Sequence, residues 1–137
     1  MVRAFDRRIA SLKLVFEFLD EFYRSDDVSE VNRYSITFVI EELFTNMVKY
    51  NPNNSNEIQL RLLKDEKKIT IDIIDYTETP FDMTKYNEVD TTLRIEERTP
   101  GGLGIHLTRK LMDDICYDFS DGRSKTTLTK YLEKKHV

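Results

Sequence analysis

Three of the chain's four glycines, Gly101, Gly102 and Gly104, lie together where a polar segment meets a predicted helix. Glycine allows the backbone to adopt positive φ and to come close to a ligand. The helix that follows directs its free N–H groups and the positive end of its dipole back toward the glycines. These features predict a site for an anion, most often a phosphate. The alternative is that the cluster is only a flexible connector.

A second group of polar residues lies on an upstream helix. At about 100° per residue, Glu42, Asn46 and Lys49 lie along one edge of its apolar stripe, whereas Glu41 lies on the other side, about 100° away. A carboxylate and an amide one turn apart can share a hydrated Mg²⁺. This ion commonly takes only one or two protein oxygens, and its other ligands are water molecules and the phosphates of the substrate. The alternative is a solvated polar edge made of i,i+4 neighbours.

Asp75 is the third candidate, at the end of a predicted strand. It shares the parity of three apolar residues, Ile69, Ile71 and Ile73, so its side chain is expected on the core face. A carboxylate there needs a partner, because unpaired burial is costly. It could accept a hydrogen bond from an amino group, such as the exocyclic amine of adenine, or it could cap the turn at the strand end.

Periodicity predicts the elements that must position these residues. Helices are expected over about residues 10–24, from Asp27 or Ser29 to about Tyr50, and over 103–115. Strands are expected over 58–62, 69–75, 117–119 and 126–132, with an edge strand over 5–9. The buried stripe of the second helix is expected to be Ile36, Ile40, Leu43 and Met47. Helices grouped apart from hairpin-paired strands indicate an α+β two-layer sandwich with a mixed or antiparallel sheet, formed by one domain over residues 1–137.

Composition excludes several classes of function. The 137 residues carry a net charge of -4 without a basic block, which disfavours nucleic acid as a partner. The chain has no apolar run long enough to span a membrane and no segment of signal-peptide type at its N-terminus, so a cytoplasmic location is expected. The single cysteine, Cys116, lies in an apolar segment and is expected to pack in the core. One cysteine and two histidines argue against a structural zinc site.

Both motifs resemble those of a known family. Glu-Glu-Leu-Phe-Thr-Asn-Met-Val-Lys-Tyr is similar to the N box of the GHKL ATPases. Pro-Gly-Gly-Leu-Gly-Ile-His-Leu-Thr-Arg-Lys-Leu-Met-Asp-Asp is similar to their second glycine box. The stretch from Ile95 to Leu132 most resembles one branch of the family, the small bacterial anti-sigma-factor serine/threonine kinases of stress response and sporulation. The resemblance covers nearly the whole chain, with the motifs in the family's order.

This resemblance implies an ATP-binding sandwich with a mobile lid between the two boxes, the polar segment of residues 76–100. It implies that Asn46 coordinates Mg²⁺ and that Glu42 is the general base that activates an acceptor serine. It also implies that the nucleotide is held by Lys49, Asp75 at the adenine, Gly101, Gly102, Leu103 and Gly104 around the phosphates, and Ser124 near Asp75. The implied partners are a sigma factor and an antagonist protein that accepts phosphate on Ser or Thr, and relatives suggest a homodimer.

The first glycine box departs from the family pattern. Thr77 stands where the family usually has glycine, and counting back from Pro80 would place Tyr76 rather than Asp75 at the adenine position. Strand parity favours Asp75, with one extra residue in the loop. The rival interpretation is therefore a catalytically inactive module that keeps the fold and sequesters a regulatory partner. The ATPase half of a two-component histidine kinase is less expected, because no phosphoacceptor helix precedes the domain.

Overall fold

The computed structural model describes residues 1–50, 54–77 and 102–132, and for residues 102–106 the backbone alone. Helices and strands follow one another in the predicted order. They are β1 (Val2–Phe5), the 3₁₀ helix η1 (Ile9–Ser11), α1 (Leu12–Ser25), α2 (Glu30–Tyr50), β2 (Ile58–Lys64), β3 (Lys68–Tyr76), α3 (Gly102–Leu111), β4 (Asp114–Ser120) and β5 (Arg123–Tyr131).

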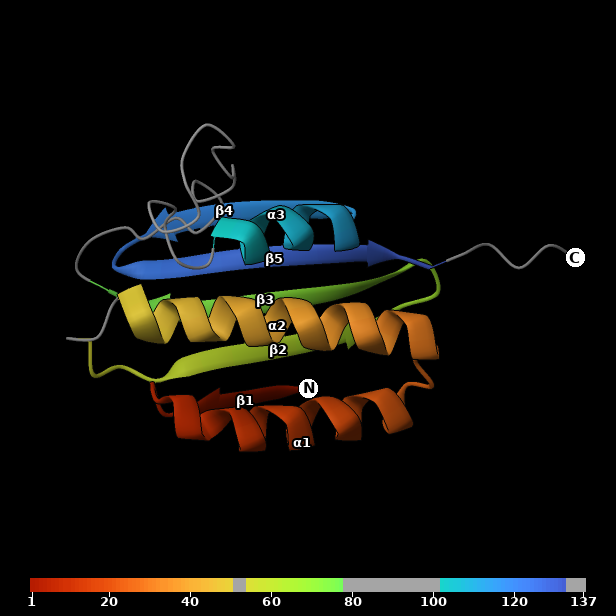
Figure 1. The fold of residues 1–137 in the computed structure, drawn as a ribbon, viewed down its shortest axis with the longest axis horizontal. Coiled ribbons are helices and arrows are strands. Elements are labelled where there is room, and N and C mark those ends of the chain that lie inside the picture. The colour runs from red at the N-terminus through yellow and green to blue at the C-terminus, as the bar shows by residue number, and fades with distance from the viewer. Residues whose placement is uncertain (51–53, 78–101, 133–137) are drawn as a thin grey trace, which may run out of the picture.

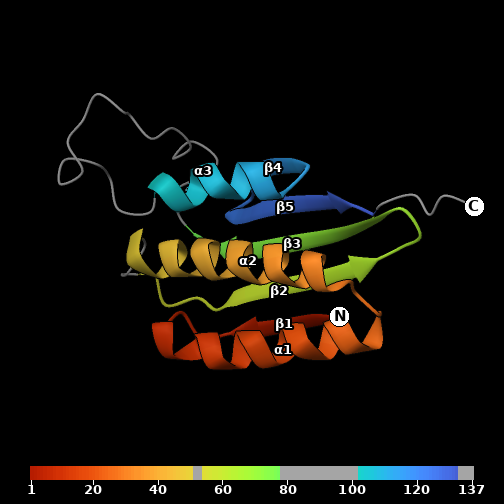
Figure 2. The same cartoon turned by 45° about the vertical axis from the view of Figure 1, so that its right-hand side comes forward.

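The five strands form a single antiparallel sheet in the order β1-β2-β3-β5-β4. All three α-helices lie on one face of this sheet, with α1 beside β1, α2 along β2 and β3, and α3 beside β5 and β4 (Figures 1 and 2). The predicted α+β two-layer sandwich is confirmed, and the sheet is antiparallel rather than mixed. Among the helices in the described part of the chain, none is long and apolar enough to cross a membrane.

The core lies between the sheet and the helices. The predicted stripe of α2, Ile36, Ile40, Leu43 and Met47, is confirmed, since each of these residues is at most 6% exposed. It belongs to the same apolar cluster as the inward residues of β3, Ile69, Ile71 and Ile73. Burial of one such side chain is worth about 1.5–3 kcal/mol. This cluster fixes the rotation of α2 over the sheet.

The start of α2 is set by a local cap. The Ser29 hydroxyl accepts a hydrogen bond from the Asn32 backbone N–H at 3.4 Å, which satisfies one of the free donors of the first turn. Asp27, the other predicted cap, adopts a left-handed φ of 51° in the turn before the helix. The cap is therefore Ser29, one of the two predicted residues.

Several predicted boundaries are wrong. β4 and β5 each begin three residues before the predicted strands over 117–119 and 126–132. α3 ends at Leu111 rather than at residue 115, because the Asp113 N–H already donates to the Thr129 carbonyl at 2.9 Å and β4 begins at the next residue. The N-terminal edge strand covers Val2–Phe5 rather than residues 5–9. It stops there because the Arg8 N–H turns back to the Asp6 carbonyl at 2.8 Å.

The predicted burial of Cys116 is also wrong, because the thiol is exposed. Its neighbours Ile115 and Tyr117 are half-buried, and strand alternation directs Cys116 to the opposite face. The thiol donates a hydrogen bond to an Asp114 carboxylate oxygen at 3.4 Å, and this bond raises the pKa of Cys116.

The hydroxyl of Tyr23 joins α1 to α2 within the core. It lies 2.7 Å from Thr37 Oγ1 and donates to the Arg33 carbonyl at 3.2 Å, and burial raises the pKa of Tyr23 to about 12.

We expect Tyr23→Phe to lower the free energy of unfolding by about 0.5–1.5 kcal/mol, because it removes these bonds while keeping the ring. Chemical denaturation measures this, with Tyr34→Phe, at an 82% exposed residue, as the control expected to change nothing. Equal effects of the two substitutions would contradict the role given to the Tyr23 hydroxyl.

Candidate functional site

The polar edge of α2 lies beside the apolar stripe, as predicted. Asn46 is 4% exposed, Glu42 is half-buried, and Glu41 and Lys49 are exposed. The Asn46 side chain makes no hydrogen bond to another described residue, so the amide of this largely buried residue remains available to a ligand. A single oxygen of this kind fits a Mg²⁺ that keeps its waters and the phosphates of a nucleotide as its other ligands.

Asp75, rather than Tyr76, faces inward at the end of β3. Asp75 is 3% exposed and Tyr76 is 50% exposed, which confirms the direction predicted from strand parity. Ser124 of β5 pairs with Asp75 across the sheet and is buried as well. The predicted proximity of Ser124 to Asp75 is therefore confirmed, whereas the roles of both residues toward a nucleotide remain predictions.

Tyr117 adds a hydroxyl to this corner that the sequence analysis missed. Its phenol oxygen lies 3.1 Å from Ser124 Oγ, with either atom able to donate. The sequence feature that could have indicated Tyr117 is the alternation of Ile115, Tyr117 and Phe119. When β4 is taken to begin at Asp114, this alternation directs Tyr117 to the helix-covered face.

Arg7 is the partner that buried Asp75 requires, and it too was missed. Its side chain is 3% exposed, and its Nη2 donates to Asp75 Oδ1. Its Nε donates to the Asn56 carbonyl at 3.2 Å and its Nη1 to the Met47 carbonyl at 3.4 Å. One guanidinium therefore connects the segment after β1, the end of α2, the segment before β2 and the end of β3.

The ionisation of Asp75 depends on two opposing effects. Burial disfavours the carboxylate and raises the pKa of Asp75. The charge and hydrogen bond of Arg7, followed by a hydrogen bond from the Tyr76 backbone N–H, act in the opposite direction. Burial is the larger effect, so the pKa stays above its ordinary value. The charged form of Asp75 therefore depends on Arg7 more strongly than that of an exposed aspartate would.

The elements that carry these side chains share one end of the molecule. The last turns of α2, the end of β3 and the first turn of α3 all lie at the same end in both views (Figures 1 and 2). Gly102 is the first residue of α3, which packs beside α2, and Leu103 and Gly104 belong to its first turn. The free N–H groups of that turn therefore open at the same end as Asn46 and Asp75. Gly101, Pro80 and most of the predicted lid lie outside the described residues.

Thr77, where the resemblance predicts a glycine, continues the sheet. Its N–H donates to the Gly122 carbonyl at 2.9 Å, which adds one hydrogen bond beyond the end of β3. The carbonyl of the preceding residue, Tyr76, accepts hydrogen bonds from the side-chain amides of Asn54 and Asn56, at 2.7 and 2.9 Å. The end of β3 is therefore fixed from both sides.

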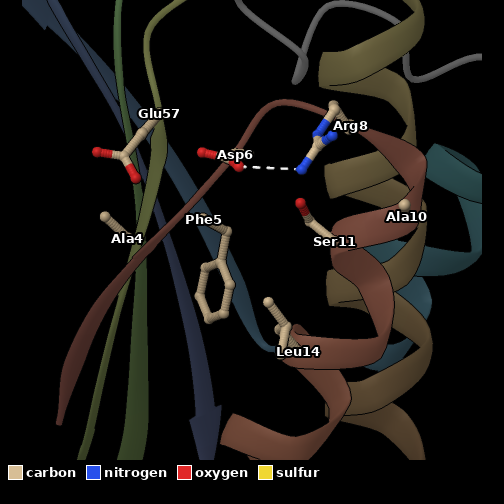
Figure 3. Close-up of a pocket in the computed structure, with 8 residues that line it drawn as sticks. All are labelled: Ala4, Phe5, Asp6, Arg8, Ala10, Ser11, Leu14 and Glu57. Atoms are coloured by element: carbon tan, nitrogen blue, oxygen red, sulfur yellow. Dashed lines mark hydrogen bonds and ion pairs between the residues drawn. The ribbon is translucent and has the colours of Figure 1, made fainter.

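A separate pocket opens between β1 and the start of α1 (Figure 3). It has a volume of about 190 Å³ and is lined by Ala4, Phe5, Asp6, Arg8, Ala10, Ser11, Leu14 and Glu57. Asp6 and Arg8 pair with each other at 3.1 Å and are exposed. Arg7, between them, has a buried side chain and does not line this pocket, so the ion pair with Asp75 belongs to the other site.

Comparison with known proteins identifies the class. The sequence pattern of the histidine kinase-like ATPase domain matches residues 5–130, so the chain belongs to that family. Among its relatives is the serine-protein kinase RsbW of Staphylococcus aureus, 30% identical over 121 residues that cover 82% of this chain and 70% of the relative.

Two further relatives also carry kinase names. The serine-protein kinase RsbW of Bacillus velezensis is 26% identical over 123 residues, 84% of this chain and 71% of the relative. The serine/threonine-protein kinase BtrW of Bordetella bronchiseptica is 26% identical over 101 residues, 72% and 70% of the two chains. The resemblance to GHKL-type serine/threonine kinases predicted from the two boxes is therefore confirmed.

Removing Asp75 tests the energetic importance of the buried pair. We expect Asp75→Ala to lower the free energy of unfolding by about 3–5 kcal/mol, because it leaves the charge of Arg7 buried without its carboxylate. Guanidinium denaturation measures the change. Asp6→Ala is the control: its ion pair with Arg8 is exposed and is expected to contribute at most about 1 kcal/mol. A loss at Asp75 no larger than at Asp6 would contradict the burial argument.

Proposed function

We propose that the protein is an ATP-dependent serine/threonine protein kinase of the anti-sigma-factor type. The observation that carries this proposal is the placement of Asn46, whose amide makes no hydrogen bond to another described residue, near the end of α2, which lies at the same end of the fold as the end of β3 and the first turn of α3. Membership of the ATPase domain family and the kinase names of the relatives support the nucleotide and the reaction class.

Each residue has a role in this proposal. Asp75 accepts a hydrogen bond from the adenine amine, and Ser124 stands beside it. The N–H groups around Gly102 and Gly104 bind the phosphates, with Gly101 and Leu103 shaping the same loop and Lys49 nearby. The Asn46 oxygen is the protein ligand of Mg²⁺, which supplies charge neutralisation when bound. Positioning and electrostatic stabilisation then carry most of the phosphoryl transfer.

Glu42 is the proposed general base. It lies one turn before Asn46 on the same edge of α2 and is half-buried. It takes the proton of the acceptor hydroxyl as that oxygen bonds to the γ-phosphorus and the bond to the departing ADP breaks. Glu41, on the exposed side of the helix, has no such access.

The proposed partners follow from the resemblance to anti-sigma kinases. The protein binds a sigma factor and phosphorylates a small antagonist protein on Ser or Thr, which releases the antagonist. A cytoplasmic location fits this role, because sigma factors act with RNA polymerase there, and a homodimer is the proposed assembly. The alternative is an inactive module that sequesters a regulator, and it is favoured by Thr77 in place of the family's glycine.

Nucleotide binding separates these two functions. We expect ATP with Mg²⁺ to raise the melting temperature, because a ligand that binds only the native state stabilises it. Asn46→Ala should remove most of the Mg²⁺-dependent part of the shift and retain the part seen with ATP and EDTA. Differential scanning fluorimetry measures both. The absence of any shift at millimolar ATP would favour the sequestering module.

A comparison of Glu42→Gln with Glu41→Gln tests the general base. Glu42→Gln should preserve ATP affinity and slow phosphoryl transfer by about 10²- to 10⁴-fold, because a base acts in the chemical step. Glu41→Gln should have little effect on either quantity. Transfer of labelled phosphate to the antagonist measures the rate and calorimetry the affinity. Equal losses of rate in both variants would show that the helical edge does not determine the base.

A further inference from the structure

Arg7 lies next to the proposed base-binding carboxylate but outside both sequence boxes. We propose that Arg7 is a positioning residue for nucleotide recognition: it holds Asp75 through one carboxylate oxygen and leaves the other for the amino group of adenine. This inference rests on the proposed nucleotide site and names a residue on which that site depends.

The first support is the way in which Arg7 is itself held. Its three hydrogen bonds go to Asp75 and to the backbone carbonyls of Met47 and Asn56, which lie in three different parts of the fold. Because a guanidinium is planar with its donors in a fixed fork, these bonds determine its orientation. The direction of the Asp75 carboxylate is therefore set by the arrangement of the surrounding elements.

The second support is the hydrogen-bonding capacity that remains on Asp75. An ionised carboxylate has about four lone-pair positions on two oxygens. Within the described part of the chain, Arg7 is the one side chain that donates to this carboxylate, and it does so at Oδ1. Ser124, the cross-strand neighbour, has its hydroxyl engaged with Tyr117. The Tyr76 backbone N–H also donates to the carboxylate. With these two donors, Oδ2 still keeps a lone pair that can accept from a ligand.

The third support is electrostatic. A hydrogen bond from an amine is strengthened when its acceptor is ionised, and burial opposes the ionisation of Asp75. Ser124, which pairs with Asp75 across the sheet, and Tyr117, which bonds the Ser124 hydroxyl, are uncharged at neutral pH, and the cation that acts on Asp75 is Arg7. Without Arg7, burial would be opposed by the hydrogen bond from the Tyr76 backbone N–H alone, and the pKa of Asp75 would rise further. Nucleotide binding that depends on the carboxylate would then fail at a higher pH than in the wild type.

The experiment is a calorimetric titration with ATP and Mg²⁺ over a range of pH. For Arg7→Met we expect affinity at neutral pH to fall about tenfold or more, the effect of losing one charge-assisted bond. We also expect the acid-side midpoint of the binding profile to move upward and the affinity to recover as the pH rises. Arg7→Lys, which restores the positive charge, should return the midpoint toward that of the wild type.

Arg8→Met is the matched control, since Arg8 is the adjacent arginine and its ion pair with Asp6 is exposed. Its binding profile should coincide with that of the wild type. Protonation of the nucleotide phosphates affects all the profiles alike, so the difference between the two arginine variants reports on Asp75.

Several results would overturn the inference. Loss of affinity in Arg7→Met with an unchanged midpoint would show a structural role alone, and tighter binding would show that Arg7 blocks the carboxylate. If Arg7→Met does not fold, the double variant Arg7→Met/Asp75→Asn, which removes both charges, replaces it. The amide that takes the place of the carboxylate does not titrate. An acid-side loss of ATP affinity with the wild-type midpoint in this variant would therefore contradict the inference. A wild type that binds no ATP at any pH would instead refute the proposed function.

Discussion

The buried ion pair between Arg7 and Asp75 is the interaction on which the site end of the fold depends. Both side chains are almost fully removed from water, at 3% and 4% exposure, and each charge would be costly without the other. The guanidinium also satisfies two carbonyls, one at the end of α2 and one before β2. The end of the sheet, the end of the central helix and the N-terminal segment are therefore held in one arrangement by a single polar cluster.

The helix α2 explains how a core and a site share one element. Its stripe of Ile36, Ile40, Leu43 and Met47 packs against β3, which fixes the rotation of the helix. Asn46 lies beside this stripe and is buried by the same packing, although its amide has no partner among the described residues. The apolar contacts thereby offset the unfavourable free energy of burying the polar Asn46 side chain and hold it in position. A preorganised site generally requires such support from the surrounding packing.

Sequence periodicity predicted the parts of this site that depend on local geometry. The inward direction of Asp75 follows from alternation along β3, and the edge position of Asn46 follows from the helical repeat of α2. Arg7 could not be found in this way, because its contact with Asp75 joins residues 68 positions apart. Parity showed that a buried carboxylate needed a partner, but the choice among the chain's 21 lysines and arginines depends on tertiary packing.

The same limit explains the errors at β4. Leu111, Met112 and Ile115 continue the helical spacing of the apolar residues of α3, so the sequence pattern does not separate the helix from the strand that follows. The separation is made by the Asp113 N–H, which pairs with Thr129 of β5, so the boundary follows from sheet formation. Once β4 starts at Asp114, alternation exposes Cys116 and turns Tyr117 toward Ser124. One non-local hydrogen bond therefore accounts for both the wrong burial of Cys116 and the missed hydroxyl of Tyr117.

The substitution of Thr77 for the family's glycine takes its meaning from this rigid end of the sheet. Glycine gives a loop conformational freedom, whereas Thr77 here forms one more hydrogen bond with Gly122, whose φ of +76° suits glycine in the hairpin turn. The adjacent Tyr76 carbonyl is held by Asn54 and Asn56. The position of Asp75 is therefore set by sheet register and by Arg7, and it does not require a flexible glycine two residues later. The carboxylate proposed to bind adenine is thus held in place with Thr77 at the position where the resemblance predicts a glycine.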